Sequence, residues 1–82
     1  MYSVYILYSN IKDKYYIGHT QDVMDRLSRH NTGRSKATKY GVPWELVYVK
    51  SFMTRSEAIK YEIKIKSMKS KKYIDELVKS NS

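Results

Sequence analysis

Two short runs of β-branched and aromatic residues, 2–8 and 15–19, open the chain and restrict it to folds that contain a hairpin. Residues of these types favour strands. Only a short polar connection separates the runs, which predicts an antiparallel hairpin with a loop longer than the two-residue type. Alternation along the first run places Tyr5 and Leu7 on the face opposite to Ile6. A sheet built on this hairpin is therefore expected.

Helix-capping residues and a third apolar run predict the remaining elements. Asp22 is a suitable N-cap and Gly33 a suitable stop for a first helix, and the Thr-Arg-Ser-Glu run at 54–57 has the form of a capping box for a second. The stretch 32–43 between them is expected to be a loop. The expected elements are strands 2–8, 15–19 and 44–52, helices 22–31 and 54–68, and a last helix that Ser70 caps. The order ββαβαα predicts one α+β domain over residues 1–82, a small sheet covered by helices.

The composition excludes several classes of protein. Without Cys, disulfide frameworks, thiolate nucleophiles and Cys-based zinc sites are ruled out, and two His cannot build a closed zinc site. The chain has neither an apolar run of membrane-spanning length nor the basic start of a signal peptide, so a cytoplasmic location away from membranes is expected. Sixteen Lys and Arg against eight Asp and Glu give a net charge of +8. That charge favours a nucleic-acid partner, with a solvated basic face as the alternative.

One acid interrupts the apolar face of the second expected helix. Helical periodicity gathers its apolar residues into one arc, and Glu62 falls near the middle of that arc. The arc comprises Ala58, Ile59, Tyr61, Ile63, Ile65 and Met68. An acid that points toward a core must be paired, bind a cation or lie at the rim of a cleft. Lys66 follows four residues later, in the favoured order for a helical ion pair, so a simple salt bridge stays an alternative to a functional role.

Two tripeptides of the expected hairpin resemble the paired signature of the GIY-YIG nuclease family. Residues 16–18 read Tyr-Ile-Gly and match its second half, whereas residues 3–5 read Ser-Val-Tyr and keep the Tyr of its first half. Eight residues after Gly18, Arg26 begins an Arg-x-x-x-His-Asn pattern that resembles the arginine helix of many members. This spacing puts Arg26 and His30 on one helix face, where one cleft could receive both.

The resemblance continues into the second helix and covers the chain from Tyr2 to about Val78. The pattern Ser-Glu-Ala-x-x-x-Glu-x-x-x-Lys at 56–66 places the family's metal-binding Glu on Glu62, the acid that periodicity had marked. An Asn that several members carry after this helix has no match. The chain looks most like the small stand-alone bacterial members. Their fold implies a three-stranded antiparallel sheet flanked by helices.

The resemblance also implies an activity, that of a metal-dependent endonuclease that hydrolyses phosphodiester bonds of DNA or structured nucleic acid. Tyr5 or Tyr16 would position or deprotonate the attacking water, and the sequence does not decide between them. Arg26 would grip the phosphate, and His30 would shuttle a proton or donate to phosphate. Glu62 alone would hold one Mg²⁺ or Mn²⁺ ion.

Simpler interpretations stay open beside this one. His30 could be a cation that suits the C-terminal end of its helix, and His19 a surface residue at a strand end. The whole chain could be a module that binds nucleic acid without cutting it. DNA is favoured over RNA, a protein partner could supply targeting, and a monomer or weak dimer is expected. The basic residues expected to contact nucleic acid are Arg29, Arg34, Lys36, Lys39 and Lys66.

Overall fold

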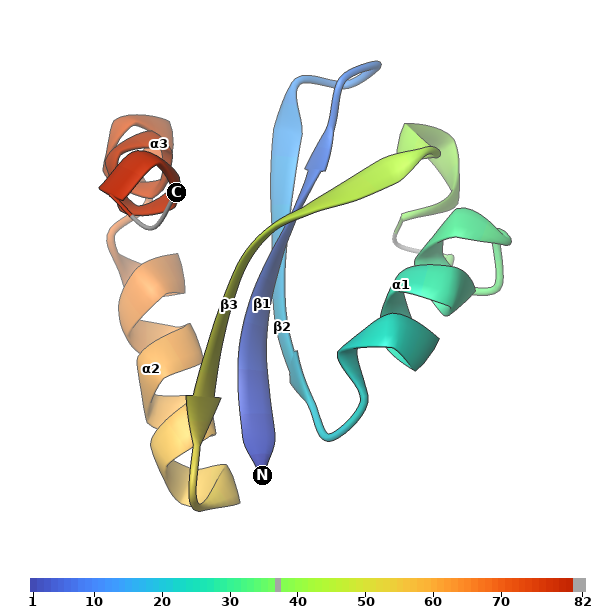
Figure 1. Cartoon of the computed structure of the whole chain (residues 1–82). Coiled ribbons are helices and arrows are strands. Elements are labelled where there is room, and N and C mark those ends of the chain that lie inside the picture. The colour runs from blue at the N-terminus through green and yellow to red at the C-terminus, as the bar shows by residue number, and fades with distance from the viewer. Residues whose placement is uncertain (37, 81–82) are drawn as a thin grey trace.

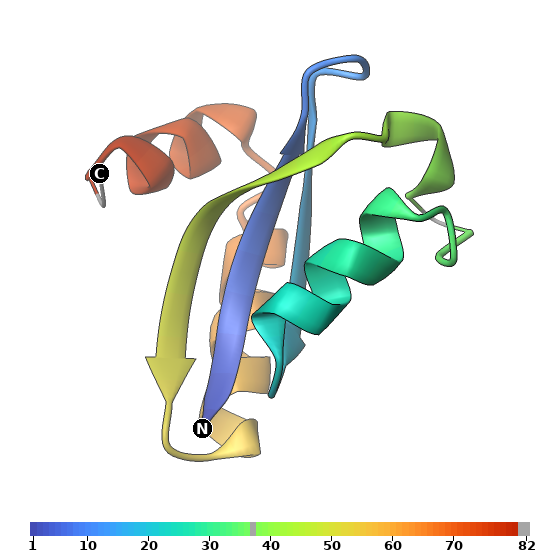
Figure 2. The ribbon, with the colours of Figure 1, turned by 45° about the vertical axis from the view of Figure 1, so that its right-hand side comes forward.

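A small sheet lies between two layers of helices (Figure 1). The computed structural model describes residues 1–36 and 38–80. Its elements are β1 (Tyr2–Ser9), β2 (Lys14–Thr20), α1 (Val23–Asn31), the short 3-10 helix η1 (Lys39–Gly41), β3 (Trp44–Phe52), α2 (Arg55–Ser67) and α3 (Lys71–Ser80). α1 covers one face of the sheet and α2 the other, and Figure 2 shows the same layers after a turn of the view. The predicted order ββαβαα and the α+β class are confirmed.

The predicted hairpin supplies the centre of the sheet. β1 pairs antiparallel with β2 in a continuous register that sets Tyr5 opposite Gly18. β3 pairs antiparallel with the other edge of β1, with one register shift between Ile6 and Leu7. The strand order is therefore β2-β1-β3, so the three-stranded antiparallel sheet is confirmed and β2 is one of its edges.

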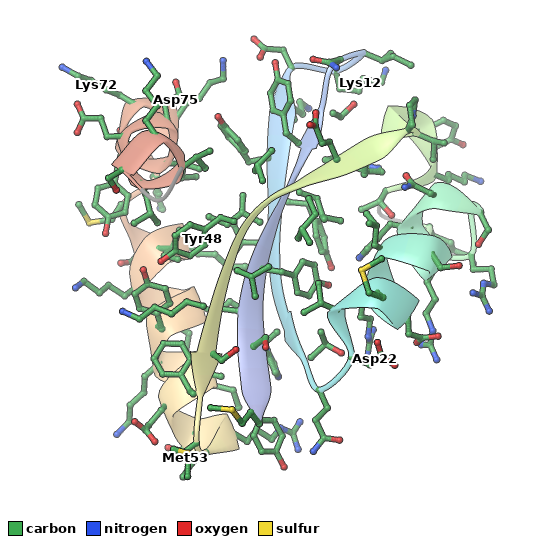
Figure 3. The ribbon with its side chains drawn as sticks, viewed as in Figure 1. Lys12, Asp22, Tyr48, Met53, Lys72 and Asp75 are labelled. Carbon is green, nitrogen blue, oxygen red and sulfur yellow. The ribbon has the colours of Figure 1, made fainter. Side chains whose placement is uncertain are left out.

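Alternation along β1 gives the sheet two apolar faces. Val4 and Ile6 belong to the core beneath α2 and α3, toward which Tyr48 also points from β3 (Figure 3). Tyr5 and Leu7 belong to a second core on the α1 side. A buried aliphatic side chain of this size contributes about 1.5–3 kcal/mol relative to an exposed one. Because both faces are covered, β1 is buried on both sides and holds the two layers together.

The helices begin at the residues that the sequence predicts. The side chains of Asp22, Thr54 and Ser70 each accept a hydrogen bond from the backbone N–H three residues later. Such caps satisfy N–H groups that have no partner inside the helix. After α1 the chain turns at Gly33, whose φ of 75° is a left-handed conformation that glycine adopts without strain.

Two expectations for local structure are wrong. The stretch 32–43 is not a plain loop, because it contains the helical turn η1. The apolar arc of α2 is also narrower than its periodicity indicates, since Ile63 and Met68 are 59% and 48% exposed. A sheet of three strands meets only one stripe of a helix, and that stripe contains the buried Ala58 and Ile65. Within the described residues, no helix combines the length and apolar character that crossing a membrane requires.

Candidate active site

Tyr5 and Gly18 form a close contact between β1 and β2. The Tyr5 ring lies across the backbone of Gly18, where an added Cβ would stand 2.6 Å from the Tyr5 hydroxyl oxygen. Only 3% of Tyr5 is exposed, and its ring centroid lies 6.4 Å from that of Tyr16 on β2. Steric contact therefore explains why the Tyr-Ile-Gly tripeptide ends in glycine, because any side chain at position 18 would displace the Tyr5 ring.

His30 links the Tyr5 hydroxyl to the loop that follows α1. Its Nε2 lies 3.2 Å from Tyr5 Oη, and its Nδ1 lies 2.7 Å from Thr38 Oγ1. Burial, and secondarily the nearby Arg26 guanidinium, lower the pKa of His30 below its usual 6.5. This lowered pKa favours a neutral imidazole near pH 7 over the alternative of a helix-end cation. A neutral imidazole donates through one nitrogen and accepts at the other, so the two hydroxyls have opposite roles.

The Tyr5 hydroxyl is held in its protonated form. Burial raises its pKa to about 12, the nearby Tyr16 adds to the rise, and the positive charge of Arg26 opposes it without cancelling it. Loss of a proton to solvent is thus unfavourable at neutral pH. A proton can leave Tyr5 readily only by passing to a neighbouring base, and the neutral His30 is hydrogen-bonded to it.

Arg26 is the cation that faces these hydroxyls. It lies on α1 one turn before His30, as the spacing of four predicts. Within residues 1–36 and 38–80 its guanidinium has neither a hydrogen-bond acceptor nor an ion-pair partner. An exposed, unpaired guanidinium is well suited to bidentate binding of a phosphate.

Glu62 is paired on both of its oxygens. Lys66 Nζ lies 2.7 Å from Oε2, and His19 Nδ1 lies 2.6 Å from Oε1. Burial alone would raise the pKa of Glu62, but the hydrogen bonds to Lys66 and His19 outweigh it and lower the pKa below the usual range. The carboxylate is therefore ionised, and the predicted ion pair and the predicted position at a cleft are both present.

Tyr5, Arg26 and Glu62 meet in one cleft of about 230 Å³ at the outer edge of β2, whereas His30 lines a hollow beside it. The residues that line the cleft are Tyr5, Tyr16, Ile17, Gly18, His19, Arg26, Glu62 and Lys66. Tyr5 and Arg26 come from the α1 side of the sheet and Glu62 from the α2 side. Because β2 has no strand beyond it, groups from opposite faces of the sheet can reach the same space.

The basic residues expected at nucleic acid are distributed unequally around this cleft. Lys66 lines it, while Arg29 and Arg34 line an adjoining hollow of about 230 Å³ together with His30 and Tyr16. Arg29 also pairs with Asp25 at 3.3 Å. Lys36 and Lys39 are exposed on the segment that carries η1, and Lys39 Nζ lies 4.9 Å from the ring centre of Tyr40.

Two residues that contact the predicted site residues, Thr38 and His19, are not among the site residues that the sequence predicts. Thr38 lies in a stretch without periodicity, so no pattern indicates its contact with His30. His19 is half-buried against Glu62 and is not the free surface residue that the simpler interpretation expects. Strand alternation could have found it, because the residue after Gly18 must point to the α2 side of β2.

Glu62 is the residue through which a metal ion could bind. It is the sole acid among the described residues that line the cleft, and the described part of the chain has no cluster of three or more His, Asp and Glu. Mg²⁺ commonly takes one or two carboxylates and completes its shell with water and phosphate oxygens. The competing contact with Lys66 is an i,i+4 pair with an exposed lysine, worth about 0.5 kcal/mol, which a divalent ion can replace. The donor set therefore fits one Mg²⁺ or Mn²⁺ ion.

Comparisons with known proteins match the sequence to one family model and to several bacterial relatives, and the fold to a solved structure. A family model described as the GIY-YIG catalytic domain matches residues 1–74. The UPF0213 protein SERP0126 of Staphylococcus epidermidis is 43% identical over 65 residues, 78% of each chain. The UPF0213 protein YazA of Bacillus subtilis is 39% identical over 68 residues, 78% of this chain and 69% of that one. The solution NMR structure of the UPF0213 protein BH0048 from Bacillus halodurans matches 96% of this chain and 84% of its own, with 32% identity and a TM-score of 0.61.

Proposed function

The chain belongs to the GIY-YIG family, and from this membership we propose that it is a metal-dependent endonuclease that hydrolyses phosphodiester bonds of DNA or structured nucleic acid. One observation carries the proposal. Tyr5 and Tyr16 from the hairpin, Arg26 from α1 and Glu62 from α2 line a single cleft. Residues from four elements thus bring hydroxyls, a free guanidinium and an ionised carboxylate to one place.

Arg26 binds the scissile phosphate in this mechanism. Its planar fork can contact two non-bridging oxygens, and its charge offsets the negative charge that grows as the water attacks. It also lines both the cleft and the adjoining hollow with Arg29 and Arg34, so a phosphate chain can pass from one to the other over this residue.

Tyr5 and His30 together take the proton of the attacking water. A hydroxyl with a pKa of about 12 cannot act as a base while it keeps its own proton. As the Tyr5 oxygen accepts a proton from water, Tyr5 passes its own proton to His30 Nε2, which lies 3.2 Å away. This transfer needs a free lone pair on Nε2 and hence a proton on Nδ1, which then donates to Thr38. Tyr16, whose hydroxyl has no hydrogen bond to a base among residues 1–36 and 38–80, would orient the water.

Glu62 would hold the metal ion, and its hydrogen bond with His19 fixes the orientation of the carboxylate. When bound, Mg²⁺ or Mn²⁺ would supply positive charge that stabilises the transition state of phosphodiester hydrolysis. Lys66, an exposed lysine that pairs with Glu62, would be available to a neighbouring phosphate once that pair opened.

Cleavage assays test this proposal. Labelled single-stranded, duplex and branched DNA are incubated with the protein in Mg²⁺, Mn²⁺ or EDTA, beside Glu62→Gln, Arg26→Lys and Tyr5→Phe variants whose folding is checked by circular dichroism. We expect cleavage by the wild type in metal alone and a loss of about 100-fold or more in each variant. Cleavage in EDTA, or undiminished cleavage by Glu62→Gln, contradicts the mechanism.

A module that binds nucleic acid without cutting it is the second candidate. It is favoured by one observation, that both oxygens of Glu62 are already hydrogen-bonded within the protein. The same assay separates the candidates, because such a module binds DNA but leaves every substrate intact in every metal. In that case Glu62→Gln, which removes a negative charge and frees Lys66, raises the affinity for DNA without any effect on cleavage.

A further inference from the structure

A second hollow, of about 350 Å³, opens beside the cleft toward the start of β2. We propose that it binds one unpaired nucleotide of the strand that is cut, an inference that rests on the proposed function. The hollow and the cleft share two lining residues, Ile17 and Lys66. Tyr15 lies two residues before Ile17 on β2, about 7 Å along the strand. A strand whose phosphate occupies the cleft can therefore continue directly into this space.

The inner wall of the hollow is apolar and is held in place. Tyr15 and Ile17 from β2 meet Ile65 of α2 and Ile74 of α3 on this wall. The Tyr15 hydroxyl donates to Asp75, which lies on α3 (Figure 3), and its ring packs 5.1 Å from that of Tyr8. A fixed aromatic ring beside aliphatic side chains is a suitable surface for the flat face of a base.

The rim of the hollow is cationic. Its lysines are Lys14, Lys66, Lys69 and Lys71. Asp13 is the sole acid among the described lining residues, and it is already bound by Lys71 at 3.0 Å and by the Tyr8 hydroxyl at 2.6 Å. Within the described residues, the ammonium groups of Lys14 and Lys69 have no carboxylate partner. These two free cations can bind a phosphate group.

The apolar wall and the lysine rim together indicate which kind of ligand the hollow can bind. A nucleotide carries a flat, weakly polar base and an anionic phosphate, which match the apolar wall and the lysine rim. A base inside a duplex has both faces covered by its stacked neighbours, so only an unpaired base can lie against the partly exposed Tyr15 ring. The preferred substrate is therefore a strand with at least one unpaired nucleotide beside the cleavage point, as in a branch or a single-stranded end.

Binding in EDTA tests the hollow without cleavage. The affinity of a fluorescent hexameric oligothymidylate is measured for the wild type, Lys69→Glu and the matched control Lys64→Glu, an exposed lysine of α2 that does not line the hollow. Both variants make the same change in net charge. We expect Lys69→Glu to lower the affinity about tenfold more than Lys64→Glu and to reduce the slope of log affinity against log salt by about 1. Equal losses in the two variants overturn the proposal.

A hexamer of the same sugar-phosphate backbone without bases tests the apolar wall. This test changes the ligand and not the protein, so it does not depend on whether a variant folds. We expect the wild type to bind this oligomer several-fold more weakly than oligothymidylate. For Lys69→Glu we expect a smaller difference in affinity between the two oligomers. Equal binding of the two oligomers by the wild type overturns the assignment of a base to the hollow. Failure of the nuclease proposal appears separately, as intact DNA in the metal-dependent cleavage assay.

Discussion

Gly18 determines the position of the Tyr5 side chain more directly than any other residue described above. Its missing side chain leaves the space that the Tyr5 ring occupies. In Gly18→Ala the new Cβ must displace this ring, which is rigid and buried. We expect cleavage to fall about 100-fold, as for a displacement near 1 Å, and the free energy of unfolding to fall by about 1–3 kcal/mol. Single-turnover cleavage and urea unfolding measure the two effects.

Gly33→Ala is the matched control for this substitution. Its Cβ enters open space, so only the left-handed backbone is strained, at about 1 kcal/mol. Cleavage should stay near that of the wild type once the folded fraction is accounted for. If both variants lose cleavage equally, the contact between Tyr5 and Gly18 has no special role.

The pH dependence of stability follows from the buried His30. Its pKa in the folded chain lies below the usual 6.5, so below that pH the unfolded chain binds more protons than the folded one. Stability is therefore complete above about pH 6.5 and declines as the pH falls below it; the lowered pKa of Glu62 adds a further loss only below its usual 4.5. Thermal unfolding between pH 7 and 5 should show the decline, and His30→Gln should reduce it.

The pH dependence of cleavage distinguishes two forms of base catalysis by Tyr5. If His30 receives the proton, the rate is flat above neutrality and falls where His30 becomes protonated, below pH 6.5. If free tyrosinate were the base, the rate would rise about tenfold per pH unit toward a pKa of about 12. Single-turnover rates between pH 5.5 and 9 separate the two, and a continuous rise contradicts the relay.

Among single residues, the sequence predicts those with a recognisable motif or periodic pattern. It misses residues that come close to the site only because of the tertiary fold. Tyr5 and Arg26 are recognisable through the family resemblance and Glu62 also through its place in a periodic pattern, and the structure brings the three into one cleft. The contact between Thr38 and His30 depends on how a loop folds back over α1. No local sequence pattern encodes the course of this loop, so the contact between Thr38 and His30 could not be predicted from the sequence.

Among the elements, the end of α1 determines where η1 and β3 begin. The Asn31 side chain donates to the backbone carbonyl of Trp44 at 3.0 Å and accepts from its N–H at 2.5 Å. The adjacent His30 is bonded to Thr38 in the same segment. Helix boundaries and strand ranges could be predicted from caps and alternation, but these cross-links and the register shift of β1 against β3 could not, because they join residues far apart in sequence.

Asn31→Ala tests this connection. It leaves both backbone groups of Trp44 without their partner, and we expect a loss of about 1–3 kcal/mol in the free energy of unfolding. The adjacent Thr32→Ala removes only exposed hydrogen bonds at the helix end and should cost about 0.5 kcal/mol or less. Urea unfolding measures both, and equal losses would show that the link between α1 and β3 contributes little.

For the whole molecule, the net charge of +8 dominates association with a polyanion. If about four phosphates are contacted around the cleft and its neighbouring hollows, the slope of log affinity against log salt is about −3 to −4. Titrations of duplex and single-stranded DNA between low and moderate salt check this value. An affinity that barely changes would mean that binding does not depend on the basic side chains around the cleft.

Because the cleft lies at the outer edge of β2, its position limits where a further strand can be added to the sheet. A further strand paired to β2, from another copy or from an insertion, would come between the Tyr5 side of the sheet and Glu62 on the other. The opposite border, β3, carries no part of the cleft. A strand that is added to this sheet while the cleft stays open can therefore pair only with β3.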